Sequence, residues 1–168
     1  MGDYKNLSDK EGIDKLKELV KSADICMFAS HADADTLSAR PMSTQDVDDD
    51  GILWFFSQAS SNKNAELEAD NRVQLFYANK NSSEYLSISG KATILKDEQK
   101  AKELWTGWVK TWFTEGPNDP ELTIIKVEPG DAYYWDTKHN KMVSLVKIMA
   151  GAIIGKTMDD SVEGHITV

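Results

Sequence analysis

Two cations bracket the stretch of this chain whose residue types could bind a ligand. Arg40 opens the segment 40–43, and Lys63 closes the small polar loop 58–63. An arginine presents a planar fork of donors to a phosphate, whereas a lysine presents a compact point charge. The hydroxyl and amide side chains of the loop could complete a ring of donors around that phosphate. The pair predicts a phosphate-binding site, and the alternative is two unrelated surface cations.

The residues between these cations have the pattern of a β-hairpin. Asp50-Gly51 is a turn signal, and an apolar run at 52–56 follows it. A hairpin can hold a flat aromatic ring against its strands while the loop at 58–63 closes on a phosphate. These are the requirements of a site for flavin mononucleotide (FMN).

The composition limits which partners the chain can have. Its 168 residues suit one domain, with a hydrophobic content of 40% and a charged content of 28%. The formal net charge of −9 argues against a nucleic-acid surface or an anionic membrane as a partner. A phosphate site must therefore depend on local rather than overall charge.

Cysteine usage and hydropathy predict the compartment. The single cysteine, Cys26, can form no internal disulfide and fits a reducing cytosol. Residues 1–5 are not followed by the apolar stretch of a secretory signal. No apolar run approaches the ~20 residues that a membrane span needs. We therefore expect a cytoplasmic protein without a membrane segment.

Hydrophobic periodicity predicts a mainly β domain with a few helices. Ser8 and Glu11 have capping-box spacing ahead of a first helix, and Gly90 suggests a bulge within a long strand. Strands are expected on both sides of Asp50-Gly51 and at residues 25–30, 36–40, 73–77, 85–95, 122–127 and 132–135. A turn at 129–130 is expected to separate the last two strands. Further helices are expected at residues 63–69, with Ser61 or Asn62 as its cap, and at 97–110 and 141–155. Many short strands interrupted by helices suggest a closed barrel with helical plugs.

The order and spacing of several short segments resemble a known family. Residues 40–42, 54–57, 62–63 and 72–73 resemble the pyridoxamine-5'-phosphate-oxidase-like FMN-binding split barrels. A second series, at residues 112–113, 116–120, 127–129 and 134–136, is most similar to the general stress protein 26 group of bacteria. The resemblance covers residues 8–157. It implies one split β-barrel domain of Greek-key type over 1–168, with a core at about 8–137, peripheral helices and a helical C-terminal extension at about 140–157.

The resemblance also implies a homodimer with FMN at its interface. In that family the residues matching Arg40 and Lys63 contact the FMN phosphate, and the tryptophan matching Trp135 reaches the flavin from the other subunit. The predicted cofactor-binding residues are Arg40, Pro41, Met42, Ser43, Trp54, Phe55, Phe56, Ser57, Asn62, Lys63, Trp112 and Trp135. For Trp112 we expect the tip of a lid over the flavin, or else core or dimer packing within a helical stripe of tryptophans.

Two positions depart from the pattern of the true oxidases. Tyr85 stands where those enzymes have a flavin-contacting glutamine, and Gln45 where they have a lysine. These departures argue against oxidation of pyridoxamine phosphate and affect flavin binding much less. We expect a weak FMN-dependent oxidoreductase that passes electrons from NADH or NADPH to a small acceptor. The alternative is a flavin-binding stress protein without turnover, and deazaflavin F420 or haem would follow from the wider superfamily.

Three other motifs are given structural interpretations. The D-x-D-x-D-G run at 46–51 lacks the glutamate of a calcium loop and is interpreted as the hairpin turn. The P-loop-like run at 150–157 lacks its first glycine and leaves little room for the required helix. His31, Asp33 and Asp35 are interpreted as a solvated hairpin tip, and no metal site is predicted.

Overall fold

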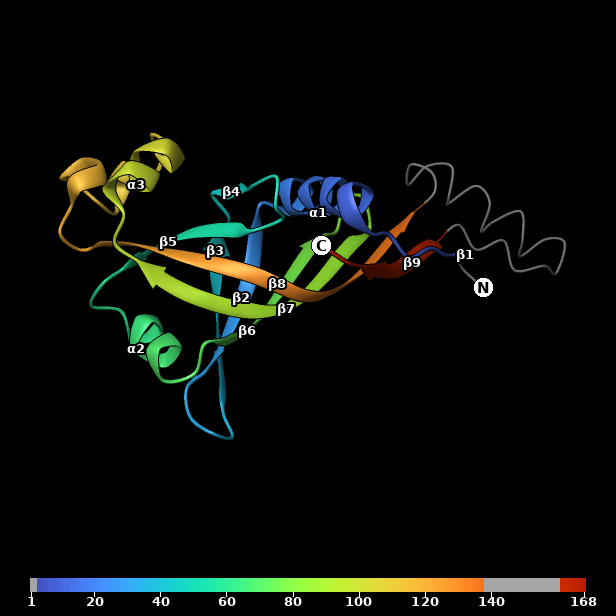
Figure 1. The fold of residues 1–168 in the computed structure, drawn as a ribbon, viewed down its shortest axis with the longest axis horizontal. Coiled ribbons are helices and arrows are strands. Elements are labelled where there is room, and N and C mark those ends of the chain that lie inside the picture. The colour runs from blue at the N-terminus through green and yellow to red at the C-terminus, as the bar shows by residue number, and fades with distance from the viewer. Residues whose placement is uncertain (1–2, 138–160) are drawn as a thin grey trace, which may run out of the picture.

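The computed structural model describes residues 3–137 and 161–168, and Figure 1 shows its fold. The helix predicted at 141–155 and the P-loop-like run at 150–157 lie outside the described residues. No helix within residues 3–137 and 161–168 has the length and apolar character needed to cross a membrane.

The described residues form one nine-stranded sheet that branches at its longest strand. The main path runs β1 (Asp3–Tyr4), β9 (Ser161–Ile166), β8 (Leu122–Thr137), β7 (Glu84–Leu95), β6 (Arg72–Asn79), β2 (Ile25–His31) and β3 (Leu37–Ser43). The short β4 (Asp46–Val47) pairs with β5 (Leu53–Gln58), which pairs with the first part of β8. Long, curved β7 and β8 therefore connect all parts of the sheet (Figure 1).

The sheet is rolled but open. The rings of Phe28 on β2 and Phe55 on β5 meet edge to face at 5.4 Å, although three strands (β6, β7 and β8) separate them along the sheet. In the described chain β3 pairs with β2 alone, so its other edge has no partner strand. Pro41 suits such an edge because proline has no N–H to give to a ladder. The mainly β prediction is confirmed, whereas the expected closure into a barrel is replaced by an open edge.

The turn predicted at residues 129–130 is wrong. β8 continues through Pro129 and Gly130 as one strand, and the ladder with β7 shifts register between Ser89 and Gly90. A Cβ atom at Gly90 would lie 2.6 Å from the carbonyl oxygen of Glu128. The irregularity predicted at Gly90 is confirmed, but the extra residue of the bulge is Gly130 on the opposite strand β8.

The weakly patterned C-terminal tail forms strand β9. This strand pairs antiparallel with β8 and parallel with β1, while the backbone N–H of Leu7 donates to the carbonyl of His165 at 2.8 Å. The residue types of 161–166 alone do not predict a strand. Its pairing is determined by distant residues.

The helices are shorter or less regularly capped than expected. Helix α1 (Asp9–Ala23) covers part of the sheet (Figure 1), but Ser8 makes no side-chain cap bond because the chain enters the helix with Asp9 at φ 50°. Helix α2 (Asn62–Ala69) is capped by Ser61, as predicted. Helix α3 (Glu98–Leu104) was predicted to reach residue 110. It ends where Trp105 adopts extended backbone angles, and 3₁₀ turns η1 (Val109–Thr111) and η2 (Gly116–Asn118) follow.

The buried side chains form two clusters separated by β5. The main core lies between the rolled sheet and α1, and the second lies between β5, β8 and the α3–η1 region. Alternation along β5 sends Leu53 and Phe55 into the main core and Trp54 into the second cluster. The end of β5 and the start of α2 are thereby held against two packed layers, and the candidate site is built there.

Candidate functional site

Lys63 lies at the first turn of α2 with its ammonium directed at serine hydroxyls. It donates to Ser57 Oγ at the end of β5 and to Ser61 Oγ at 3.3 Å. No carboxylate in residues 3–137 or 161–168 forms an ion pair with this ammonium. Lys63 is thus a partly buried cation whose charge has only neutral hydrogen-bond partners in the described chain.

Arg40 lies on β3 and is held by three side chains. Its guanidinium donates to Ser30 Oγ on β2, to Ser38 Oγ at 2.7 Å, and to Glu66 Oε2 on α2 at 2.7 Å. The side chain is 23% exposed and that of Glu66 is 14% exposed. Arg40 and Lys63 therefore stand on different elements but share one partly buried region. This region, the cation cluster, comprises Arg40, Ser57, Ser61, Lys63 and Glu66.

The electrostatics of this region favour an anion. Burial, together with the nearby charge of Arg40, lowers the pKa of the Lys63 ammonium to about 8, while Glu66 opposes the shift. Burial acts to raise the pKa of Glu66, but hydrogen bonds from Ser30 and Arg40 outweigh it, so this pKa lies below its usual value. Glu66 is consequently ionised at neutral pH. An anionic ligand beside both cations would relieve their mutual repulsion.

A buried polar network fixes the loop between β5 and α2. Ser57 Oγ donates to Asn64 Oδ1 at 2.7 Å, and Asn64 Nδ2 donates to Thr123 Oγ1 at 3.0 Å. The Thr123 hydroxyl donates back to the carbonyl of Ser57 at 2.9 Å. All three residues are buried, and none of the described buried side-chain polar atoms is left unpaired. The network pins Ser57 in the position from which it contacts Lys63.

The aromatic residues of β5 do not all face this cluster. Phe55 points to the same side as Ser57 but is fully buried in the core. Trp54 and Phe56 belong to the opposite face, where the indole Nε1 of Trp54 donates to Asp48 at 2.9 Å and the Phe56 ring lies 6.2 Å from that of Trp105. The structure therefore brings Ser57 to Lys63 and leaves these three rings in packing positions.

The other predicted residues on β3 and α2 are divided in the same way. Met42 shares the face of Arg40 and is buried in the core, whereas Pro41 and Ser43 are exposed on the other face. Asn62 is exposed at the start of α2. The unpaired edge of β3 leaves main-chain groups of residues 40–43 accessible to a ligand.

The two predicted tryptophans lie apart from the cation cluster. Trp112 is 65% exposed after η1, next to Phe113, whose ring packs 6.4 Å from Phe56. Trp135 is 41% exposed at the opposite end of β8 from Thr123, paired in register with Tyr85. Within one copy of the chain, Trp135 does not join Arg40 and Lys63.

The outer face of the sheet carries large exposed apolar side chains. Strand register places Met27 beside Phe76, and Tyr85 beside Trp135. The outer face is defined here by Ile25, Met27, Phe76, Tyr85 and Trp135, all exposed. Contiguous apolar surface of this kind marks interaction sites.

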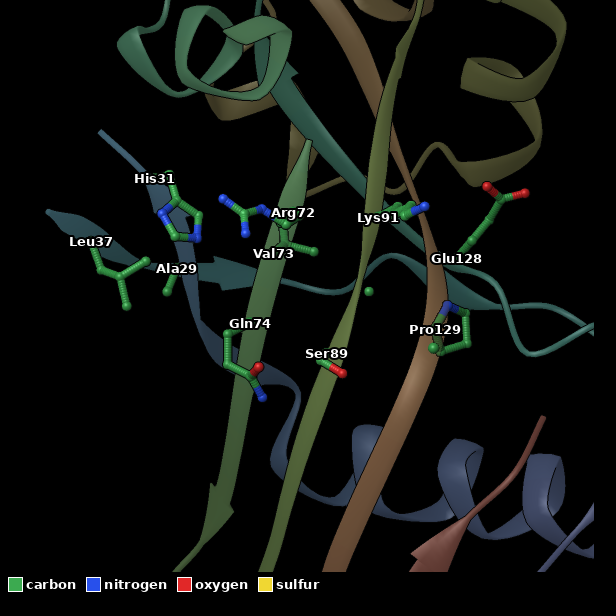
Figure 2. Close-up of a pocket in the computed structure, with 12 residues that line it drawn as sticks. Ala29, His31, Leu37, Arg72, Val73, Gln74, Ser89, Lys91, Glu128 and Pro129 are labelled. Atoms are coloured by element: carbon green, nitrogen blue, oxygen red, sulfur yellow. The ribbon is translucent and has the colours of Figure 1, made fainter. Parts of the chain in front are cut away.

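A hollow of about 600 Å³ opens at one end of this outer face (Figure 2). Arg72, Lys91 and Glu128 lie next to one another across β6, β7 and β8 along its edge. Ala29 and Leu37 line it, whereas the adjacent Ser30 and Ser38 point to the other face and bond Arg40. The hollow and the cation cluster are therefore on opposite faces of the sheet.

The acidic motifs have structural roles in the described chain. The carboxylate of Asp48 accepts from the N–H groups of Asp50 and Ile52, which confirms that residues 46–51 form the hairpin turn. Asp33 likewise accepts from the backbone at the hairpin tip. The described acidic group with metal-compatible spacing is instead Glu18, Glu84 and Asp136, where Asp136 is already bonded to Lys15.

Sequence reasoning missed the residues that hold the two cations. They are Ser30, Ser38, Asn64, Glu66 and Thr123. One signal was available: Glu66 follows Lys63 by three residues in a predicted helix and so shares its face. The role of Thr123 could not be inferred because it comes from a strand far along the chain.

Comparison with known proteins identifies the family. The model of the pyridoxamine 5'-phosphate oxidase like family matches residues 11–159. The chain belongs to this family. Among curated family relatives, protein bli-3 of Neurospora crassa is 26% identical over 129 residues, which cover 71% of this chain and 62% of that protein. General stress protein 26 of Bacillus subtilis is 31% identical over 61 residues, covering 36% of this chain and 43% of that protein.

Solved structures of family members have the same fold. A crystal structure from Jannaschia sp. CCS1, described as a general stress protein 26, has a TM-score of 0.76 at 20% identity and covers 93% of this chain and 95% of its own. The general stress FMN/FAD-binding protein of Xanthomonas citri has a TM-score of 0.66 at 27% identity, covering 77% of this chain and 90% of its own. The resemblance to general stress protein 26 seen in the sequence is confirmed.

Proposed function

We propose that this protein binds FMN at the interface of a split-barrel homodimer and acts as a weak FMN-dependent oxidoreductase. The observation that carries the proposal is that Arg40, held by the hydroxyls of Ser30 and Ser38, and Lys63, beside the hydroxyls of Ser57 and Ser61, share one partly buried region. A related protein of Xanthomonas citri, described as FMN/FAD-binding, supports a flavin as the ligand.

The phosphate would be held by the cation cluster. The Lys63 ammonium has no carboxylate partner in the described chain, and the hydroxyls of Ser57 and Ser61 lie beside it. Charge-assisted donors of this kind are the usual ligands of phosphate. FMN is favoured over a dinucleotide because a terminal phosphate monoester places nearly two charges on one group, matching two neighbouring cations.

The isoalloxazine ring would lie along the open edge of β3. Main-chain N–H groups within residues 40–43, Pro41 excepted, could hydrogen-bond its polar rim, because this edge has no partner strand in the described chain. FMN itself supplies the hydride and electron chemistry, and the protein orients the ring and excludes water. We propose NADH or NADPH as donor and a small molecule as acceptor.

The outer face would form the homodimer. It carries exposed Met27, Phe76 and Trp135, which a second copy could cover. Trp135 is far along β8 from Thr123, which contacts the cation cluster. Trp135 can therefore complete a flavin site only on the partner copy, as the family resemblance implies.

A non-catalytic flavin carrier is the second candidate. The Xanthomonas citri relative is described by flavin binding rather than by a reaction. Such a protein would act as a flavin reservoir, sensor or redox buffer under stress. A cytoplasmic location stays a prediction from the single cysteine, which is buried.

One experiment tests the site and a second separates the two candidates. The purified protein is mixed with FMN, passed through gel filtration, and its absorbance spectrum is recorded. We expect flavin bands that travel with a dimer-sized peak; a colourless peak would contradict the proposal. Anaerobic mixing of the complex with NADH or NADPH then distinguishes an oxidoreductase, which bleaches, from a carrier, which does not.

A further inference from the structure

The arrangement around Arg40 gives a specific part to a residue outside the predicted cofactor contacts. We propose that Glu66 is a positioning residue that holds the Arg40 guanidinium in the orientation that receives the phosphate. This inference rests on the proposed function, since it concerns the phosphate end of the same site. It adds a residue that would contact Arg40 rather than the flavin.

Ser30, Arg40 and Glu66 form a closed ring of hydrogen bonds. The Ser30 hydroxyl donates to Glu66 Oε2 at 2.6 Å, Arg40 NH1 donates to Ser30 Oγ, and Arg40 NH2 donates to Glu66 Oε2 at 2.7 Å. The members come from β2, β3 and α2, so the ring ties together two strands and the helix that carries Lys63. Ser30 is fully buried, which keeps water from replacing its bonds.

The ring leaves a defined part of the Arg40 fork for a ligand. A guanidinium carries five N–H donors. NH2 donates to both Ser38 and Glu66, and NH1 donates to Ser30. The Nε–H and one NH1 hydrogen remain without a described partner. Glu66 therefore restricts Arg40 to one orientation, in which these two N–H donors are left for a ligand.

Glu66 also divides the two cations into different roles. Arg40 is paired with the carboxylate of Glu66 at 2.7 Å. Lys63, which precedes Glu66 by three residues on α2, has no ion pair in the described chain. A guanidinium that is already held loses little rotamer freedom when a phosphate arrives. In this inference Arg40 is a guanidinium already held in its binding orientation, and Lys63 is the cation without an ion pair in the described chain.

The test compares four variants by their dissociation constants for FMN and for riboflavin, which lacks the phosphate. Glu66→Asp keeps the charge but shortens the reach to Arg40, Glu66→Gln keeps the reach but removes the charge, and Glu66→Ala removes both. Glu68→Gln is the matched control, an exposed acid on the same helix. Quenching of flavin fluorescence gives each constant, and thermal unfolding shows that each variant is folded.

We expect Glu66→Ala to raise the FMN dissociation constant about ten-fold, and Glu66→Asp about three- to ten-fold, with riboflavin binding unchanged. Glu66→Gln should stay within about three-fold of wild type because its amide oxygen can still accept from Arg40. Glu66→Asp keeps the test decisive if the alanine variant does not fold.

Three outcomes would overturn the inference. Unchanged FMN dissociation constants in both Glu66→Asp and Glu66→Ala would remove the positioning role. Equal losses for FMN and riboflavin would show a general structural role instead. A large loss in Glu66→Gln with none in Glu66→Asp would assign the effect to charge. Failure of the wild-type protein to prefer FMN over riboflavin would instead overturn the proposed phosphate site itself.

Discussion

The cation cluster and the outer face are built on opposite principles. In the cluster, Arg40, Ser57 and Glu66 are each fixed by short hydrogen bonds, and Lys63 has no ion pair among the described residues. On the outer face, Phe76 is 49% exposed and Trp135 is 41% exposed. In the proposed function, the first region would serve a small charged ligand and the second a protein surface.

The largest effect is expected from a charge on the outer face. Phe76→Glu would place an unpaired carboxylate in the proposed dimer interface, at a cost of about 3–5 kcal/mol for each buried charge. We expect a folded monomer in sedimentation or gel filtration. Phe76→Leu is the matched control and should stay dimeric. A dimeric Phe76→Glu variant would show that the outer face is not the interface.

The next largest effect is expected at the two cations. Arg40→Ala and Lys63→Ala each remove a charge-assisted phosphate contact worth about 1.5–3 kcal/mol, which is about ten- to 150-fold in the FMN dissociation constant. Riboflavin binding should change little. Lys102→Ala, which removes an exposed lysine of α3, is the control. Unchanged FMN dissociation constants in both Arg40→Ala and Lys63→Ala would show that the cation cluster does not bind FMN.

The polar network under the cluster should affect stability more than binding. Asn64→Ala leaves the buried hydroxyls of Ser57 and Thr123 with fewer partners, and we expect a loss of about 1–3 kcal/mol in the free energy of unfolding. Denaturant titration measures it. Asn62→Ala, an exposed neighbour on α2, should have the unfolding midpoint of the wild type. Equal midpoints for both variants would mean that the network is not needed for the fold.

The smallest effect is a pH dependence of FMN affinity. The pKa of Lys63 is lowered to about 8 in the free protein, and a bound phosphate would raise it, so binding takes up a proton where the pH exceeds that value. Affinity should be full below this pH and fall by up to about ten-fold per pH unit above it. Lys63→Arg, which stays charged, should abolish the fall. A flat profile in the wild type would exclude Lys63 as the responsible group.

The sequence predicted those parts of the molecule that local signals determine. The irregularity at Gly90, the hairpin turn at 46–51 and the Ser61 cap all follow from residue types within a few positions. Arg40 and Lys63 were predicted as site residues through their residue types and a family pattern, and their role stays a prediction.

Long-range pairing determined the rest. β9 and the uninterrupted β8 depend on partners far along the chain, as does the bond from Asn64 to Thr123. The opposite orientation of Trp54 and Phe56 relative to Ser57 could have been predicted, because successive side chains of a strand point to opposite faces. Grouping all of β5 into one site overlooked that period.

The parallel pairing of β1 with β9 has a consequence for how the molecule folds. Ladders joining β2, β3, β6 and β7 use residues 25–95 and can form while synthesis is still under way. The partner of β1, by contrast, is made only when the ribosome reaches residues 161–166. Contacts of such sequence separation are slow to form. The edge at β1 is therefore expected to be completed last, and a nascent chain would expose the edge of β8 that pairs with β9 until then.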